Sequence, residues 1–271
     1  MGKKTYMRLG LIVLFAIIVR LIFFNGVGSS DDLRYTYYAN DMMTGSYKVP
    51  FDHHGTRIAF VYLTSKIYSA FGINDFSSVL LPFLASIGNI ILIFFIGRMV
   101  FDEEVGLTGA LLMSFFPLEV IFSTKLMPDI VAVFFVGLCA AMFLKGETMK
   151  SKNLARILYI ASGLSLGLAY LMRENSILII LFFGLYVLIN KRFKTEYFLM
   201  GTGFIFFILL DMYFFYLLTG DFFYRISTVN KHFLNIFVLE NYYGRASIFG
   251  FLFAFPFIIF RDLQFGLFYP F

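Results

Sequence analysis

Two adjacent aspartates, Asp31 and Asp32, are the residues best suited to acid–base chemistry, and an arginine and a tyrosine follow within three positions. Adjacent carboxylates beside an apolar segment repel each other, so one of them should have a raised pKa and serve as a general base. The alternative is a plain loop or a helix cap, because Ser30 and Asp31 could cap a helix starting at Leu33. The pair predicts a general base and leaves the capping role open.

One charged residue lies inside the apolar run that precedes this pair. Arg20 stands about one turn from the C-terminal end of the segment Leu9–Phe24. A charge within a membrane segment marks a functional site by default, so we expect Arg20 to pair with Asp31 or Asp32. The alternative is that its long side chain extends to the membrane interface.

The sequence Asp52-His53-His54 contains side chains of the kinds that bind divalent metals. The signal for a metal is weak, because adjacent side chains rarely converge on one ion. Hydrogen bonding to a substrate, or a plain interfacial loop, is favoured instead. We therefore predict that these residues do not bind a metal. Whether the activity of the protein requires a divalent metal stays open.

Three further cationic side chains could bind the phosphate head of a lipid whose hydrocarbon tail stays in the membrane. Arg173 follows a long apolar run, Lys125 lies between two such runs, and Arg225 follows another. Fixed positive charge at a membrane boundary binds phosphate. The alternative for Arg173 is an internal pair with Glu174. Asp129 opens a predicted helix, where an N-cap role and a functional role are equally supported.

These residues must be positioned by a membrane-embedded scaffold. Of the 271 residues, 60% are hydrophobic and only 14% are charged, and the mean hydropathy is +0.82. A soluble domain carries about 25% charged residues. The apolar runs are long and continuous rather than alternating, which argues against a transmembrane barrel and predicts an all-α polytopic membrane protein. The net charge of +5 is explained by basic inner loops, so no nucleic-acid partner is expected.

The segment Ile58–Phe71 decides the predicted topology, because it is short for a span and carries Lys66 in its middle. If it crossed the membrane, the basic linkers 145–156 and 191–194 would lie outside, against the positive-inside rule. If it lies on the outer surface as an interfacial helix, both linkers are cytoplasmic. We therefore predict one domain over residues 1–271, with about eight transmembrane helices and both termini cytoplasmic. The predicted spans are Leu9–Phe24, Val79–Ile96, Val105–Pro117, Ile130–Leu144, Leu154–Met172, Ile177–Ile189, Phe198–Leu218 and Ser247–Phe260.

Four short motifs occur in a characteristic order over residues 8–230. They are Arg20-Leu21 followed by Asp31-Asp32 and Tyr35, Arg57-Ile58 followed by Phe71-Gly72, Ser114 to Pro117 followed by Lys125 and Asp129, and Gly167-Leu168-Ala169 followed by Arg173-Glu174. In this order they resemble the polyprenyl-phosphate-dependent glycosyltransferases of the GT-C class, the family that includes protein O-mannosyltransferases and lipid A aminoarabinose transferases. Asp32 stands where these relatives usually carry glutamate.

This resemblance implies a GT-C-like fold with interfacial helices in the first outer loop, and Asp31 as the catalytic base with Asp32 beside it. It implies transfer of a sugar from a lipid-linked donor, with inversion, to a hydroxyl of a protein, lipid or glycan on the extracytoplasmic face of the cell membrane. Such relatives continue with further spans, so a short member, a fragment or half of an assembly is expected. The expected substrate-binding residues are Arg20, Arg34, His53, His54, Arg57, Lys125, Asp129, Arg173, Glu174 and Arg225.

The main alternative is a non-enzymatic transporter or lipid-binding membrane protein. A transporter gathers its ionisable residues near the bilayer midplane, often on broken helices. This sequence instead places them at one predicted interface, with Asp211 as the exception. It also has no Walker P-loop, dinucleotide fingerprint or HExxH motif. The pattern favours an enzyme that consumes no nucleotide.

Overall fold

The computed structural model describes residues 2–28, 30–191 and 193–232, and these residues form helices and loops with no strand. The helices follow from the long apolar runs, because a backbone in lipid must satisfy its hydrogen bonds within each segment. In chain order the labelled helices are α1 (Lys3–Ile22), α2 (Asp31–Thr44), α3 (Ile58–Phe71), α4 (Asp75–Val100), α5 (Glu103–Phe115), α6 (Pro117–Ser123), α7 (Asp129–Thr148), α8 (Lys152–Met172), the 3₁₀ helix η1 (Glu174–Leu178), α9 (Ile179–Asn190) and α10 (Tyr197–Thr219). Residues 224–232 are also helical.

Five of the described helices are long and apolar enough to cross a membrane, namely α1, α4, α7, α8 and α10. The pair α5 and α6 would form a sixth span that is bent by 59°. These elements confirm an all-α polytopic membrane protein. Of the eight predicted spans, Ile177–Ile189 corresponds to η1 and α9, which are shorter apolar helices. The predicted span Ser247–Phe260 lies outside the described residues.

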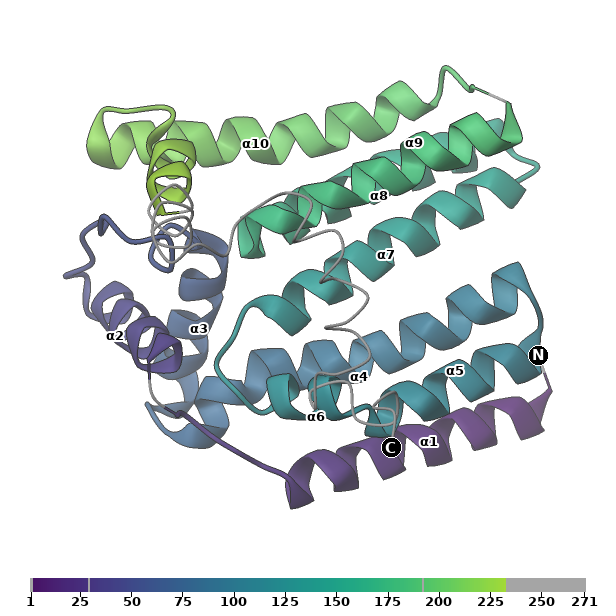
Figure 1. Cartoon of the computed structure of the whole chain (residues 1–271), viewed down its shortest axis with the longest axis horizontal. Helices are drawn as coiled ribbons and strands as arrows, with labels where there is room; N and C mark the ends of the chain where they lie inside the picture. Colours follow the sequence, from purple (N-terminus) through teal and green to yellow (C-terminus); the bar gives the residue numbers. More distant parts are fainter. Residues whose placement is uncertain (1, 29, 192, 233–271) are drawn as a thin grey trace, which may run out of the picture.

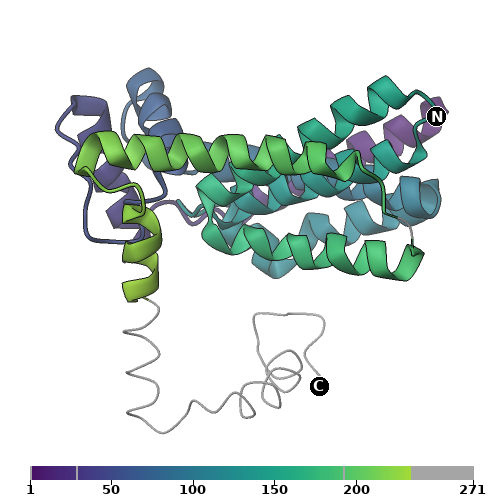
Figure 2. The ribbon, with the colours of Figure 1, turned by 90° about the horizontal axis from the view of Figure 1, so that it is seen from above.

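The long helices lie side by side, and α2 and α3 lie across one end of them (Figure 1). We call this the first-loop end. The N-terminus and the α4–α5, α7–α8 and α9–α10 connections lie at the opposite end, which we call the basic end (Figures 1 and 2). Helix α3 covers the segment predicted to be interfacial, and it does not run with the bundle. The two basic linkers thus share an end with the N-terminus.

Small residues allow the closest helix contacts. A Cβ atom on Gly97 of α4 would lie 2.9 Å from the Cα atom of Gly106 of α5, and one on Gly106 would lie 2.5 Å from the carbonyl oxygen of Phe94. Gly203 of α10 approaches α8 similarly, since its Cβ would lie 2.6 Å from the carbonyl oxygen of Ile160. Glycine at such crossings lets helix backbones pack directly in a membrane.

Helix α2 begins at the aspartate pair, which places both carboxylates in its first turn. Negative charge is favourable there because the first turn of a helix carries partial positive charge. Ser30 makes no side-chain cap of the helix and has a positive φ of 67°. Its hydroxyl lies 3.1 Å from Asp31 Oδ1 instead. The open capping alternative is therefore not realised by Ser30.

Candidate active site

The two aspartates of the pair have different surroundings. Asp31 Oδ1 lies 3.2 Å from His54 Nε2, and the Asp31 side chain is 40% exposed. Asp32 is buried, and its Oδ2 accepts a hydrogen bond of 2.9 Å from the backbone N–H of Gly28. Successive residues of a helix face different directions. The first turn of α2 therefore offers one accessible carboxylate and one enclosed carboxylate.

This difference decides which carboxylate has the raised pKa. Burial raises the pKa of Asp32, the nearby charge of Lys125 opposes this, and repulsion from Asp31 contributes least. Burial also acts to raise the pKa of Asp31, but its contacts with His54 outweigh burial and lower it. The expectation that repulsion raises one pKa is thus corrected, because burial is the main cause and Asp32 is the residue affected.

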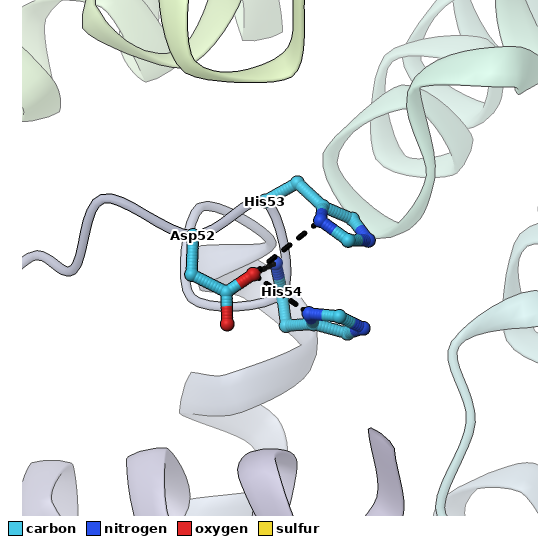
Figure 3. Close-up of side chains that lie close together, drawn as sticks. All are labelled: Asp52, His53 and His54. Atoms are coloured by element: carbon cyan, nitrogen blue, oxygen red, sulfur yellow. Dashed lines mark hydrogen bonds and ion pairs between the residues drawn. The ribbon is translucent and has the colours of Figure 1, made fainter. Parts of the chain in front are cut away.

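Asp52 gathers the neighbouring polar side chains of the first loop around its two oxygens. Its Oδ1 lies 2.7 Å from His54 Nδ1 and 3.3 Å from His53 Nδ1 (Figure 3). Its Oδ2 accepts hydrogen bonds of 2.9 Å from Arg34 and 3.0 Å from the Tyr38 hydroxyl. The two adjacent imidazoles therefore converge on one carboxylate oxygen, which adjacent side chains rarely do on an ion. The three candidate ligand atoms lie within 4.8 Å of one another.

Local backbone geometry explains this convergence. The backbone N–H of His54 donates to Asp52 Oδ1 at 3.1 Å. An aspartate that accepts from the N–H two residues later folds the chain into a tight turn. Both imidazoles are thereby brought to the same carboxylate oxygen.

A second network of charged and polar side chains links five elements at the first-loop end, namely α2, α3, η1, α10 and the helix over residues 224–232. Arg57 donates to the Tyr35 hydroxyl and lies 3.4 Å from Glu174 Oε2. The other oxygen of Glu174 lies 3.1 Å from Arg225, whose guanidinium also lies 3.0 Å from Asp211 Oδ1. Arg225 is only 2% exposed. We therefore do not retain Arg225 as a phosphate ligand, because the buried carboxylate of Asp211 and the partly buried carboxylate of Glu174 already neutralise it.

Arg173 and Asp129 form an ion pair between the end of α8 and the start of α7. Their side chains are 35% and 29% exposed. Glu174 does not take the predicted place as the partner of Arg173, since its carboxylate pairs with Arg57 and Arg225. Asp129 is the first helical residue rather than the N-cap, which is Pro128. Both side chains are thus available at the protein surface.

The Arg173–Asp129 pair borders a groove of about 540 Å³. Helices α7 and α9 supply most of the apolar wall. The lining residues are Asp129, Ala132, Val133, Val136, Arg173, Asn175, Ser176, Leu178, Ile179 and Phe182. Burial and the charge of Arg57 lower the pKa of Arg173, while the charges of Glu174 and Asp31 raise it. Asp31 is thus within electrostatic reach of the groove.

The expected pairing of Arg20 with Asp31 or Asp32 is wrong. Arg20 is fully buried and donates hydrogen bonds of 3.0 and 2.8 Å to Ser86 Oγ. Ser86 in turn donates to Glu119 Oε1 at 2.7 Å. Helix α1 turns Arg20 toward α4, α5 and α6, so its guanidinium is hydrogen-bonded within the bundle and is linked to Glu119 through Ser86. A substrate-binding role for Arg20 is therefore not retained.

Two tyrosines belong to the site, of which Tyr35 was part of a sequence motif without a predicted role and Tyr38 was not predicted. Tyr35 accepts from Arg57, and Tyr38 donates to Asp52. They stand four residues after Asp31 and Arg34 respectively, which is the spacing that places side chains on one helix face. That spacing is the sequence signal that could have identified both tyrosines.

The helical bundle, the crosswise first loop and the charged first-loop end define a polytopic membrane protein of the GT-C glycosyltransferase class. A sequence profile described as dolichyl-phosphate-mannose-protein mannosyltransferase matches residues 54–215. This match covers more than half of the chain, so the chain belongs to that family. The resemblance seen in the four motifs is thereby confirmed. No curated protein matches the chain.

Two crystal structures of ArnT from Cupriavidus metallidurans share the fold. The chain is 19% identical to the apo structure, with a TM-score of 0.60, and 18% identical to the structure bound to undecaprenyl phosphate, with a TM-score of 0.61. The alignments cover 94% and 97% of this chain but only 49% and 50% of ArnT. The chain therefore spans about half the length of ArnT.

Proposed function

We propose that this chain carries the donor site and catalytic base of a membrane glycosyltransferase that uses a polyprenyl-phosphate sugar. The observation that carries the proposal is the groove beside Arg173, which joins one cationic side chain to an apolar wall. A polyprenyl phosphate has the matching chemistry, since an anionic head is attached to a long hydrocarbon tail. The undecaprenyl phosphate bound to ArnT supports this donor class.

In this proposal Arg173 binds the donor phosphate and exchanges part of its contact with Asp129 for that phosphate. Arginine is suited to this role because its planar guanidinium binds two phosphate oxygens at once. Lys125 lies in the turn between α6 and α7, where its charge acts on Asp32. We assign it as an additional cation near the donor.

The chemical step is a single displacement at the anomeric carbon of the sugar. The acceptor hydroxyl oxygen bonds to that carbon while the bond from the carbon to the phosphate oxygen breaks. Asp31 takes the hydroxyl proton, and the phosphate leaves with the bonding electrons, stabilised by Arg173. Attack from the face opposite the phosphate inverts the anomeric configuration. The acceptor is a hydroxyl of a protein, a lipid or a glycan.

The exposure of Asp31 supports its role as the base. Its side chain is 40% exposed, so an acceptor can reach it, whereas Asp32 is enclosed. His54 lies behind Asp31 and holds it at the start of α2. Arg57 and Glu174 then act as positioning residues, because they tie α2 and α3 to the end of α8. His53 and Arg34 support the loop through Asp52.

The proposed orientation follows the positive-inside rule. The basic end, with the N-terminus and the basic linkers 145–156 and 191–194, faces the cytoplasm. The first-loop end faces the other side of the membrane, where α2 and α3 lie at the interface. We assign the whole of residues 1–271 to one domain. The C-terminus, expected to be cytoplasmic, lies outside the described residues.

A reconstituted transfer assay tests the proposal. The full chain in lipid vesicles would receive a radiolabelled polyprenyl-phosphate sugar and membrane extract as the source of acceptors. We expect wild type and Asp41→Asn, a control on the same helix, to transfer the label, and Asp31→Asn to bind donor without transferring it. Full transfer by Asp31→Asn would remove Asp31 as the base. Donor binding without transfer by wild type would indicate a lipid-binding protein instead.

A further inference from the structure

All three histidines of the chain lie together at the first-loop end. The ring centroids of His53 and His54 are 3.8 Å apart, and those of His53 and His232 are 3.9 Å apart. His232 comes from a helix over residues 224–232, far along the chain from the first loop. The proposed sugar transfer uses none of the three imidazoles to move a proton or to bind the donor. Their gathering around Asp52 therefore calls for a separate explanation.

The contacts around Asp52 are close to the ligand spacing of a compact metal site, and one of them is shorter. Zinc binds imidazole nitrogen and carboxylate oxygen at about 2.0–2.2 Å, so neighbouring ligand atoms of a tetrahedral site lie about 3.3 Å apart. Asp52 Oδ1 lies 2.7 and 3.3 Å from the Nδ1 atoms of His54 and His53. Figure 3 shows both imidazoles turned toward this one oxygen. Replacement of the protons between them by one ion requires only small movements.

Neighbouring side chains already hold Asp52 and His54 in place through atoms that would not bind the ion. Arg34 and Tyr38 both donate to Asp52 Oδ2, whereas Oδ1 contacts only His54 and His53 among these side chains. An ion at Oδ1 would take the place of the two ring contacts and leave the backbone N–H of His54 as a donor to this oxygen. Nε2 of His54 is buried, makes no aligned hydrogen bond, and lies 3.2 Å from Asp31. An ion on Nδ1 would place the ring proton on Nε2, facing that carboxylate. Imidazole ligands whose second nitrogen faces a carboxylate are a regular feature of zinc sites.

We propose that Asp52, His53 and His54 bind one Zn²⁺ ion through one carboxylate oxygen and two imidazole nitrogens. Two imidazoles favour zinc over magnesium or calcium, which prefer oxygen ligands. A cavity of about 320 Å³ opens beside Asp52 and His53, so water can complete the coordination. The positive charge of Arg34 is directed at Oδ2 and not at the ligand atom. The site contains none of the groups proposed to move the proton or to bind the donor, and it adjoins Asp31 through His54.

The ion would fasten the first loop to the helix over residues 224–232. His53 would bind the ion through Nδ1 in the plane of its ring, while one face of the ring stacks on His232. It would also orient His54, and through it Asp31. The metal thus acts as a structural clamp, and its removal is expected to lower stability before it affects any chemistry.

Metal analysis of the purified full chain tests the proposal. We expect wild type, incubated with ZnCl₂ and then desalted, to retain one zinc per chain, and to unfold at a higher temperature with zinc than with a chelator. The Asp52→Asn/His54→Gln double variant should lose the zinc and the thermal shift. The control Asp41→Asn, another aspartate of the first loop region, should keep both.

Retention of one tightly held zinc by the double variant would overturn the ligand set, and equal stabilisation of wild type by Mg²⁺ would overturn the choice of metal. If the double variant does not purify as a monodisperse species, Tyr38→Phe serves as the second test. It removes a contact behind Asp52 but no ligand, and such changes weaken metal binding about 10- to 100-fold. Unchanged zinc affinity in Tyr38→Phe would contradict the proposed geometry.

Discussion

Two clusters built from the same residue types lie at opposite ends of the bundle. At the basic end, Glu147 accepts hydrogen bonds from Tyr159 (2.6 Å), Tyr197 (2.9 Å) and Tyr186 (3.2 Å) and from the ammonium of Lys194 (2.9 Å). Its side chain is only 14% exposed. Both carboxylate oxygens are therefore occupied, and the cluster ties α7, α8, α9 and α10 together.

The side chains gathered at the first-loop end also include carboxylates, tyrosines and cations, but some of them are accessible to solvent. Asp31 is 40% exposed, and cavities of about 320 and 540 Å³ lie at this end. Arg173 is 35% exposed at the mouth of the larger one. A carboxylate whose two oxygens both accept hydrogen bonds from the protein stabilises the fold, whereas a solvent-accessible carboxylate can contact a substrate. Solvent accessibility, and not residue composition, therefore separates the stabilising role of one cluster from the substrate-binding role proposed for the other.

The largest expected effect comes from Asp31→Asn, because an amide cannot accept the acceptor's proton. We expect kcat for sugar transfer to fall about 10²- to 10⁴-fold, with little change in the thermal unfolding midpoint. Steady-state transfer kinetics and a thermal melt of the same preparation measure both. Glu147→Gln is the matched control at the other end, and a comparable loss of kcat in that variant would break the comparison.

Arg173→Ala should have the next largest effect, since it removes the cation at the mouth of the groove. A charge-assisted contact contributes about 1.5–3 kcal/mol, so the KM for the polyprenyl-phosphate donor should rise at least about tenfold. Donor titrations in vesicles measure this change. Arg8→Ala is the control, because Arg8 is 56% exposed at the basic end, where it pairs with Glu104. An equal rise in KM for Arg8→Ala would show that the effect is not local to the groove.

Glu147→Gln should act on stability alone. The amide keeps one acceptor oxygen but loses the charge that neutralises Lys194. A net loss of about 1 kcal/mol corresponds to a fall of about 2–4 °C in the unfolding midpoint. Glu104→Gln provides the comparison, because Glu104 is 76% exposed and should tolerate the change. An unchanged unfolding midpoint for Glu147→Gln would show that the cluster around Glu147 does not stabilise the fold.

Tyr159→Phe should have the smallest effect, since three donors to Glu147 remain. The aromatic ring stays in the core, and only the 2.6 Å hydrogen bond is lost. We expect the midpoint to fall by less than about 2 °C and transfer to stay at the wild-type level. Tyr6→Phe, at an exposed position, is the control in the same melting experiment. A fall larger than that of Glu147→Gln would mean that Tyr159 stabilises the bundle in some other way.

Much of the fold could be predicted from the order of apolar and basic segments. The segment Ile58–Phe71 was assigned to the surface from loop charge alone, and α3 has these bounds and lies across the bundle. The span Ile177–Ile189 was less accurate, because hydropathy does not show where a helix changes to the 3₁₀ form at η1. The bend between α5 and α6 was likewise not predicted, although Pro117 stands at that position.

The site was predicted less completely than the fold. The sequence draws attention to Asp31, Asp32 and Arg173 because charges at the ends of apolar runs are conspicuous, and their roles stay predictions. Their partners were not found. Arg20 was expected near the aspartates, yet it lies against Ser86 within the bundle. A helix presents a different face at each successive residue, so distance along the chain is a poor guide to pairing.

The sequence by itself determined the membrane class, the grouping of basic linkers at one end and the family. Hydropathy and loop charge are summed over segments, so they need no knowledge of packing. Only the tertiary structure decided which charges meet. Arg57 reaches Glu174 and Arg225 reaches Asp211 because α3, α8 and α10 pack at particular rotations. The convergence of His53 and His54 on Asp52 depends likewise on one turn of the backbone. The interaction energy of an ion pair falls steeply with the distance between the charges and with their exposure to solvent. It therefore depends on the three-dimensional positions of the side chains.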